Sequence, residues 1–249
     1  GVTPFNFPVM VPLWMFPIAI AVGNSFILKP SEKDPLATMY IAQLFSEAGL
    51  PDGVLNVLNG DKEVSNTLLS DKRIKATSFV GSTPVAKHIY KTSSINGKRC
   101  QALGGAKNHA LVLPDANIKQ TVNQLLGAAF GSSGQRCMAL SVVVAVGGIG
   151  KELIDELKIQ MSSFKVGPYH EEANNFGPLV SKDHMNNVLM SINSAEKDGA
   201  EIIVDGRNDC KVKQKYKNGY YLGATLIDKV KASMQSYKQE IFGPVLQII

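Results

Sequence analysis

The sequence has few cysteines and no long, uninterrupted apolar run. Cysteine occurs three times in 249 residues, an odd number that argues against a framework of paired disulfides and favours a reducing compartment. The nearest candidate for a membrane span, residues 9–22, is short and contains Pro12 and Pro17. We therefore expect a buried helix there rather than a membrane segment. The four histidines lie far apart, without the spacing of metal ligands, so no metal site is expected.

The composition is that of a globular protein with a substantial core. Hydrophobic residues make up 45% and charged residues 19% of the chain, and the length suits one large domain or two ordinary ones. The net charge is +5, and the clearest basic run is KVKQKYK at residues 211–217. No aromatic platform for stacked bases is organised around this run. We expect a solvated hairpin edge there rather than a nucleic-acid surface.

Strand-like and helix-like segments alternate along the chain, which is typical of an α/β fold with a parallel, doubly wound sheet. In such sheets ligands bind beyond the carboxyl ends of the strands. The Gly104-Gly105 pair is the best candidate boundary between two halves, residues 1–104 and 105–249. Strands are expected at 25–28, 54–58, 74–80, 110–113, 141–146, 201–204 and 221–227, and helices at 35–48 with Asp34 as N-cap, 63–69, 82–91, 117–129 with Asp115 or Asn117 as cap, 150–164 and 183–197.

Cys137 is the first candidate for chemistry. It follows the glycine-rich turn at residues 131–134, and Arg136 precedes it directly. A neighbouring cation and an open, flexible backbone both favour the thiolate form of a cysteine. On this residue alone, a nucleophile and a buried core cysteine are equally good interpretations.

Four further residues have a functional and a structural interpretation. Asn6, between prolines and aromatics in PFNFP, could donate an amide hydrogen to an oxyanion, or simply form a turn. Glu32 in LKPSE could accept the hydroxyls of an adenine ribose, or cap a surface turn. Ser82 opens a helix where a phosphate would be favoured, although the segment is not a GxGxxG motif. Glu240, in EIFGP, could equally be an exposed glutamate before a strand.

Taken together, these segments resemble a known family. PFNFP, LKPSE, FVGST, a Gly-Gly pair, GQRC and EIFGP occur here in the order of the successive signatures of the aldehyde dehydrogenase superfamily, over the whole chain. The resemblance implies an α/β fold with a Rossmann-type coenzyme domain, of which residues 1–104 are the C-terminal part, and an incomplete catalytic domain at 105–249. It implies a chain truncated at both ends and a homo-oligomer, a tetramer when full length. No nucleic-acid or membrane partner is expected.

The resemblance also implies roles for individual residues. Cys137 would attack the aldehyde carbonyl, and Asn6 would stabilise the oxyanion. Hydride transfer to NAD would leave a thioester on Cys137. Arg136 would bind a substrate carboxylate. The NAD-binding residues implied are Thr3, Phe5, Lys29, Glu32, Lys33, Ser82, Glu240 and Phe242.

One position departs from the pattern of most hydrolytic members. They carry Glu-Leu-Gly-Gly where this chain has Ala102-Leu-Gly-Gly105, so the base that activates water is replaced by a methyl group. Together with AKNH, LPDAN, PLWMFP and GQRCMA, this resembles the methylmalonate-semialdehyde dehydrogenases, the CoA-acylating branch that acts in valine and pyrimidine breakdown. That resemblance implies coenzyme A as acyl acceptor and the mitochondrial matrix, or the bacterial cytoplasm, as location. A hydrolytic enzyme with a relocated base and an inactive, truncated dinucleotide-binding pseudoenzyme remain the alternatives.

Overall fold

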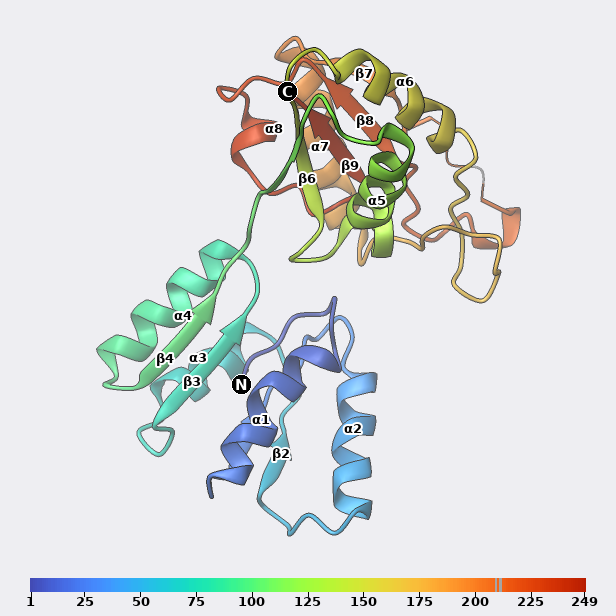
Figure 1. The fold of residues 1–249 in the computed structure, drawn as a ribbon. Helices are drawn as coiled ribbons and strands as arrows, with labels where there is room; N and C mark the ends of the chain where they lie inside the picture. The colour runs from blue at the N-terminus through green and yellow to red at the C-terminus, as the bar shows by residue number, and fades with distance from the viewer. Residues whose placement is uncertain (209, 211) are drawn as a thin grey trace. The chain divides into compact units, whose positions relative to one another are not determined.

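The computed structural model describes residues 1–208, 210 and 212–249. They form two compact units, unit 1 (Gly1–Gly105) and unit 2 (Ala106–Ile249). The boundary follows Gly105, one residue after the predicted position. Each unit is an α/β structure with hydrophobic clusters of its own (Figure 1), so the predicted fold class is confirmed.

Unit 1 contains helices that alternate with parallel strands, as the sequence pattern predicts. β1 pairs with β2 and β3 pairs with β4, both in parallel. Its elements, in chain order, are α1 (Met10–Ala21), β1 (Phe26–Leu28), α2 (Leu36–Glu47), β2 (Leu55–Val57), α3 (Lys62–Ser70), β3 (Ala76–Val80), α4 (Thr83–Ile95) and β4 (Arg99–Leu103).

The segment at residues 1–3 joins these two strand pairs. The Val2 N–H donates to the carbonyl of Ser78 at 2.9 Å, and the Thr3 N–H donates to the carbonyl of Lys29 at 3.1 Å. The order across the sheet is therefore β2, β1, residues 1–3, β3 and β4. Residues 1–3 lie in the middle of this order. The chain then forms β1 and the edge strand β2 on one side of residues 1–3, and afterwards β3 and β4 on the other side. The point where the order reverses lies between residues 1–3 and β3, and in doubly wound sheets ligands bind at the carboxyl end of this point.

Helices cover both faces of the unit 1 sheet. Val11 and Met15 of α1 pack against Val80, whereas α3 and α4 pack against Phe79. Adjacent residues of a strand point to opposite faces, so Phe79 and Val80 mark the two sides. The connections therefore alternate around a central sheet, as a doubly wound fold requires.

α1 is a helix, as predicted, but the expectation that it is buried is wrong for one of its sides. Val11 and Phe16 are fully buried, whereas Trp14 and Ile18 are 50% and 67% exposed. The segment is apolar all round, and within unit 1 the sheet covers only one side of it. Among the described residues, no helix has both the length and the apolar character needed to cross a membrane.

α2 also begins differently from the prediction. Pro35 occupies the N-cap position expected for Asp34 and makes no side-chain capping hydrogen bond. The end of the helix agrees with the prediction, because Gly49 follows it with a φ of 93°, a left-handed conformation that glycine adopts without a Cβ penalty.

Unit 2 is built on a five-stranded sheet. Its order is β5-β6-β9-β8-β7, parallel throughout except for the antiparallel edge strand β7. The elements, in chain order, are β5 (Asn108–Val112), α5 (Ile118–Phe130), the 3-10 turn η1 (Gly131–Gly134), β6 (Leu140–Ala145), α6 (Gly150–Met161), α7 (Lys182–Lys197), β7 (Glu201–Val204), η2 (Gln214–Tyr216), β8 (Thr225–Asp228), α8 (Gln235–Lys238) and β9 (Val245–Ile248).

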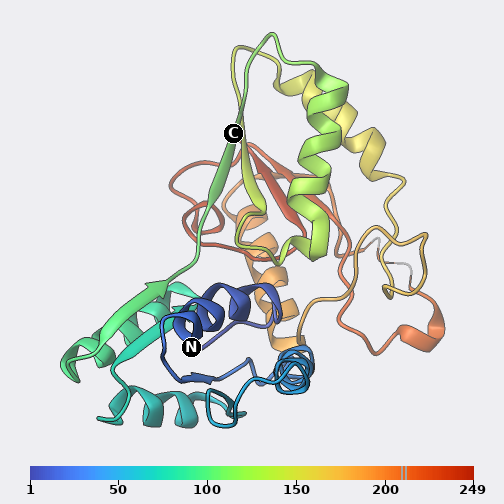
Figure 2. The same ribbon diagram turned by 60° about the horizontal axis from the view of Figure 1, so that its bottom comes forward.

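Helices also cover both faces of this sheet (Figure 2). α5 and α6 enclose one cluster with Val143 and Leu246. α7 encloses a second cluster with Ile227 and Val245. α5 begins at the cap predicted as one of two alternatives, because the Asn117 side chain accepts a hydrogen bond from the Gln120 N–H at 3.0 Å.

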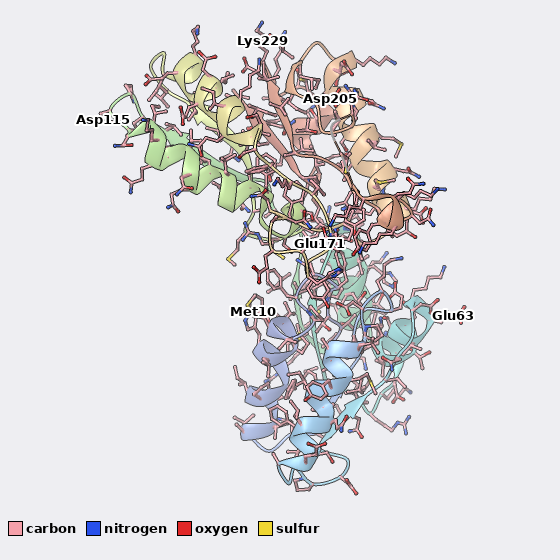
Figure 3. All side chains as sticks on the ribbon, turned by 90° about the vertical axis from the view of Figure 1, so that its right-hand side faces the viewer. Met10, Glu63, Asp115, Glu171, Asp205 and Lys229 are labelled. Atoms are coloured by element: carbon pink, nitrogen blue, oxygen red, sulfur yellow. The ribbon has the colours of Figure 1, made fainter. Side chains whose placement is uncertain are left out.

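The basic run does not form a hairpin edge. Residues 214–216 form η2, and Lys213 pairs with Glu171 at 2.9 Å. Figure 3 labels Glu171. The expected hairpin is therefore wrong for residues 212–217, and Lys211 lies outside the described residues.

Candidate functional site

The turn before Cys137 has an unusual backbone. Ser132, Ser133 and Gly134 have consecutive φ values of 54°, 58° and 68°. Left-handed geometry costs a residue with a side chain about 1–2 kcal/mol. Such strain persists only where the surrounding structure enforces it, and it concentrates at functional sites.

Contacts with the segment before α7 fix this turn. The Ser133 hydroxyl donates to the carbonyl of Gly177 at 2.7 Å. Gln135 is buried, and its side-chain oxygen accepts from the Val180 N–H at 3.0 Å. Both residues therefore stabilise the backbone that presents Cys137.

Cys137 itself is half-buried in a turn between η1 and β6. Its carbonyl accepts a hydrogen bond from the Asn108 side chain at 2.8 Å, and the same amide group donates to the carbonyl of Ala139 at 2.9 Å. Partial exposure distinguishes this position from that of a fully buried core cysteine.

Glu240 follows α8, in the loop that leads into β9. Partial burial raises the pKa of its carboxyl group, while the Ala106 N–H and the Lys107 ammonium oppose that rise. Lys107 donates to the carbonyls of Ser236 at 2.7 Å and Gln239 at 2.8 Å. Burial lowers the pKa of Lys107 to about 8.

Phe242, two residues further on, has a φ of 55°. The Nε2 of His184 lies 2.7 Å from the Phe242 carbonyl oxygen, so the imidazole donates there when Nε2 carries its hydrogen. His184 belongs to α7, which also packs against the β9 side of the sheet. The loop is therefore held from two sides.

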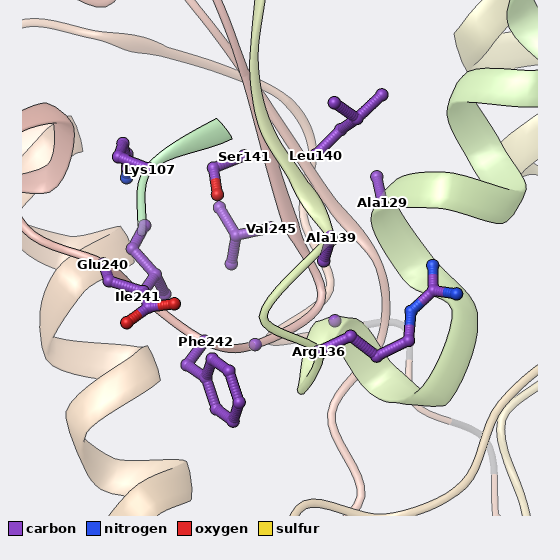
Figure 4. Close-up of a pocket in the computed structure, with 12 residues that line it drawn as sticks. Lys107, Ala129, Arg136, Ala139, Leu140, Ser141, Glu240, Ile241, Phe242 and Val245 are labelled. Carbon is purple, nitrogen blue, oxygen red and sulfur yellow. The ribbon is translucent and has the colours of Figure 1, made fainter. Parts of the chain in front are cut away.

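The turn at residues 131–137, called the nucleophile turn below, and the loop at residues 239–244, called the Glu240 loop, line one small pocket (Figure 4). Gly134 and Arg136 line it from the turn, and Glu240 and Phe242 line it from the loop. Gly134 approaches Gly243 so closely that any side chain at position 134 would overlap the Gly243 carbonyl oxygen. Within unit 2, the structure therefore brings together the two segments that the sequence predicts to cooperate.

Arg136 contacts the end of α5. Its Nη2 donates to the carbonyls of Gly127 and Ala128, both at 2.7 Å, in the last turn of the helix, where Gly127 also accepts from the Gly131 N–H. The Nε atom is buried and has no hydrogen-bond partner among the described residues. A guanidinium carries five N–H donors, so the helix contact leaves donors for an anion in the pocket.

The predicted coenzyme residues of unit 1 follow the carboxyl ends of neighbouring strands. Lys29 is 3% exposed, and its ammonium donates to the carbonyl of Pro30 at 2.7 Å and contacts the Glu32 carboxylate at 3.4 Å. Glu32 remains half-exposed, while the backbone N–H of the exposed Lys33 donates to the Ser31 hydroxyl. One buried cation thus orients a carboxylate that solvent can reach.

Two further features of this edge suit a dinucleotide. Thr3 is 4% exposed, and its buried hydroxyl has no hydrogen-bond partner among the residues that the structure describes. Ser82 is the N-cap of α4 but makes no side-chain capping bond, so its hydroxyl and the first amides of the helix are available to a phosphate. Both lie at the reversal point of the strand order, where the fold favours a nucleotide.

Three predicted residues are placed within unit 1 only. Phe5 and Asn6 lie in the bend that follows residues 1–3, and Ala102 lies in β4 opposite Phe79. That these residues lie near Cys137 of unit 2 stays a prediction. No group of three or more metal-ligating side chains was found in the described part of the chain.

Sequence reasoning did not assign roles to Lys107, Asn108 or His184. The available signal was weak: a polar triplet, Lys107-Asn108-His109, stands where an apolar strand begins. Such a triplet indicates only the start of a strand. The residues that it contacts are far away in the sequence, so they form no local pattern with it.

Comparison with known proteins agrees with this geometry. A sequence model described as "Aldehyde dehydrogenase family" matches residues 1–249. The malonate-semialdehyde dehydrogenases of Bacillus cytotoxicus and Bacillus cereus are 51% and 52% identical over 249 residues. The match covers 100% of this chain and 51% of each relative. The chain thus spans about half the length of these curated relatives.

Solved structures give the same result. A crystal structure of methylmalonate-semialdehyde dehydrogenase from Oceanimonas doudoroffii matches with a TM-score of 0.97 and 62% identity, over 100% of this chain and 51% of that one. A structure from Sinorhizobium meliloti, described as a methylmalonate-semialdehyde dehydrogenase complexed with NAD, matches with a TM-score of 0.97 and 50% identity, over 100% and 50% of the two chains. These relatives are bacterial.

Proposed function

The chain belongs to the aldehyde dehydrogenase family, and on that premise we propose that the protein oxidises malonate semialdehyde and methylmalonate semialdehyde with NAD and transfers the acyl group to coenzyme A. The observation that carries the proposal is the meeting of the Cys137 turn with the Glu240 loop in one pocket. The names of the similar proteins supply the substrate class.

Cys137 is the nucleophile in this proposal. Its thiolate attacks the aldehyde carbonyl and forms a thiohemiacetal, whose oxyanion accepts hydrogen bonds from the Asn6 amide and the Cys137 N–H. NAD, when bound, accepts the hydride from the former aldehyde carbon. The carbonyl that re-forms is a thioester on Cys137.

Arg136 recognises the carboxylate of the semialdehyde. Its guanidinium is held on the end of α5, and the residue lines the same pocket as Glu240. A planar, permanently charged fork suits a carboxylate better than a lysine ammonium would. Anchoring by α5 means that little side-chain entropy is lost when the substrate binds.

For NAD, the proposal carries over the role that the family resemblance implies for each residue. Glu32, oriented by Lys29, accepts the hydroxyls of the adenine ribose, with Lys33 beside it and Ser82 at the pyrophosphate. Thr3 and Phe5 line the dinucleotide path. Glu240 would hold the nicotinamide ribose, and Phe242 would pack near the ring. The Glu32 carboxylate disfavours a 2′-phosphate, so NAD is preferred to NADP.

Ala102 decides how the thioester is released. A methyl group cannot take a proton from water, so hydrolysis lacks its base at this position. The thiol of coenzyme A gives up its proton to water and attacks the thioester instead, and Cys137 leaves as the thiolate. The bond to the carboxylate carbon breaks with loss of carbon dioxide, the carbon left behind takes up a proton from water, and the product is acetyl-CoA or propionyl-CoA. Such products fit pyrimidine and valine breakdown.

Assembly and location are also part of the proposal. We propose a homo-oligomer, a tetramer in the full-length protein. The bacterial origin of the similar proteins favours the bacterial cytoplasm over the mitochondrial matrix.

The direct test supplies the intact protein with malonate semialdehyde and NAD, with and without coenzyme A. Acetyl-CoA should form only with coenzyme A, and little free acid should appear without it. Cys137→Ser should abolish NADH formation while NAD still binds. Acid formation at an equal rate without coenzyme A would support hydrolysis, and NAD binding with no turnover would support a pseudoenzyme.

A further inference from the structure

Lys107, directly before β5, and Asn108, its first residue, contact the two functional segments of unit 2. Lys107 donates to the carbonyls of Ser236 and Gln239, directly before Glu240. Asn108 donates to the carbonyls of Cys137 and Ala139, on either side of the exposed Met138. These contacts span more than a hundred residues of chain in one case and about thirty in the other.

His109 extends the contact with the Glu240 side. Its Nε2 lies 2.9 Å from the Tyr237 hydroxyl, and its Nδ1 lies 2.8 Å from the Lys107 carbonyl. The imidazole and the Tyr237 ring meet edge to face, with centroids 5.4 Å apart. The one-turn helix α8 is thus bound to β5 at three points, two through Lys107 and one through His109.

The pleat of a strand explains why one triplet can serve two loops. Successive side chains of a strand point to opposite sides. The hydrogen bonds direct Lys107 and His109 toward α8, and Asn108, between them, toward the nucleophile turn. A shift of the chain by one residue would exchange the two sides and break every one of these contacts.

We propose that Lys107 and Asn108 are positioning residues: Asn108 holds the Cys137 turn in its reactive conformation, and Lys107 holds the Glu240 loop in its NAD-binding conformation. The inference deepens the proposed function and rests on it for the roles of Cys137 and Glu240. Neither residue touches the reacting atoms. Each acts through the backbone carbonyls that it binds.

The chemistry of the two side chains suits this division. An asparagine amide supplies two hydrogens, and Asn108 uses its nitrogen to bridge two carbonyls without placing a charge beside the thiol. A lysine ammonium makes stronger, charge-assisted bonds to carbonyls, and its charge also favours the ionised form of Glu240. Asn108 thus fixes the backbone of the Cys137 turn, whereas Lys107 fixes the backbone of the Glu240 loop and also favours the charge of the Glu240 carboxylate.

Each residue has a matched control in this chain. Asn117 also caps a segment of unit 2, but its side chain accepts a hydrogen bond rather than donating one. Lys98 is a second buried lysine whose ammonium bridges two loop carbonyls, those of Asp71 and Ile74, before β3 in unit 1. Asn→Asp removes the donor at either asparagine, and Lys→Met removes the ammonium at either lysine.

The test measures two properties of the intact protein and its variants. The rate of Cys137 alkylation by iodoacetamide is followed by peptide mass spectrometry against pH, with Cys100 as internal reference. The dissociation constant of NAD is measured by titration. Asn108→Asp should slow Cys137 alkylation at least tenfold and move its pH profile upward, because a carboxylate beside the turn disfavours a thiolate. NAD affinity should change less than twofold.

Lys107→Met should show the reverse pattern, with NAD affinity at least fivefold weaker and alkylation within twofold of wild type. Asn117→Asp and Lys98→Met should leave both properties unchanged. If Asn108→Asp does not fold, Asn108→Gln keeps the donor but displaces it by one methylene, and it should fold and still react more slowly. A wild-type alkylation rate in either Asn108 variant, or wild-type NAD affinity in Lys107→Met, overturns the proposal.

This outcome is separable from that of the proposed function. The proposed function is read from acetyl-CoA formation by the wild-type protein alone. The positioning roles are read from alkylation and NAD binding, neither of which requires turnover. A wild-type protein that makes no acetyl-CoA would refute the function and leave the effects of Asn108 and Lys107 measurable.

Discussion

Gly134 lies so close to the carbonyl oxygen of Gly243 that a Cβ atom at position 134 would overlap it. The glycine also has a φ of 68°, which a residue with a side chain rarely adopts. The nucleophile turn and the Glu240 loop are therefore in contact through bare backbone. This contact fixes the spacing between the backbones of the two segments at Gly134 and Gly243.

Gly134→Ala should be strongly destabilising. The left-handed backbone costs about 1–2 kcal/mol with alanine, and the overlap with Gly243 adds about 1–3 kcal/mol. Gly148→Ala is the matched control, because Gly148 has a φ of 86° but nothing within 4 Å of its Cβ position. Urea unfolding and Cys137 alkylation measure the outcome. Equal losses of stability in the two variants would contradict the close approach.

Lys107 should make stability depend on pH in the alkaline range. Its pKa is lowered by burial to about 8 from 10.5, so between these values the unfolded chain holds a proton that the native protein has released. Stability then rises with pH across this window. Relative to Lys107→Met, the wild-type protein should gain up to about 3 kcal/mol between pH 8 and 10.5. A pH-independent difference in urea unfolding would contradict the buried ammonium.

Much of the fold could be predicted because its signals are local. The apolar runs at residues 25–28, 54–58 and 74–80 each contain a strand, and the turns between them carry glycine where φ is positive. β8 shows the limit of this reasoning. It begins at Thr225 rather than at residue 221, because Gly223 donates to the carbonyl of Gly206 instead of pairing with a neighbouring strand.

The candidate site likewise contains residues that the sequence could identify and contacts that it could not. Cys137 and Glu240 stand in short motifs, so their residue types and neighbours indicate chemistry. The contacts that hold these two residues in place are not indicated by any such motif. Lys107 and Ser236 are 129 residues apart in the chain, and only the completed sheet brings β5 beside α8. The exposed side of α1 could not be predicted either, because an apolar segment does not reveal which side a sheet will cover.

The discrimination between NAD and NADP should depend on Glu32. Its half-exposed carboxylate stands 3.4 Å from the Lys29 ammonium, and a 2′-phosphate at that point would meet like charge. Glu32→Ser should lower the ratio of kcat/KM with NAD to kcat/KM with NADP at least tenfold, which corresponds to about 1.4 kcal/mol of discrimination. Glu47→Ser is the control, since Glu47 is an exposed carboxylate at the end of α2 bound to Gln43. An unchanged ratio in Glu32→Ser would place the adenine ribose elsewhere.

Ala102→Glu should convert part of the acyl transfer into hydrolysis. Ala102 lies in β4 and packs half-buried against the cluster that contains Phe79, so a carboxylate there is partly desolvated and its pKa should rise toward that of a useful general base. Without coenzyme A, the intact variant should release free acid at least tenfold faster than the wild-type protein.

The adjacent residue provides the control for this substitution. Gln101 is exposed, and its side chain points to the opposite face of β4, within 3.2 Å of the Ser78 hydroxyl. Gln101→Glu therefore adds the same charge to the same strand without placing a base at position 102. Acid release and acetyl-CoA formation are measured for both variants after their melting temperatures have been compared. If both variants release acid at the wild-type rate, position 102 does not face the thioester, and the absence of a glutamate there cannot explain a preference for coenzyme A.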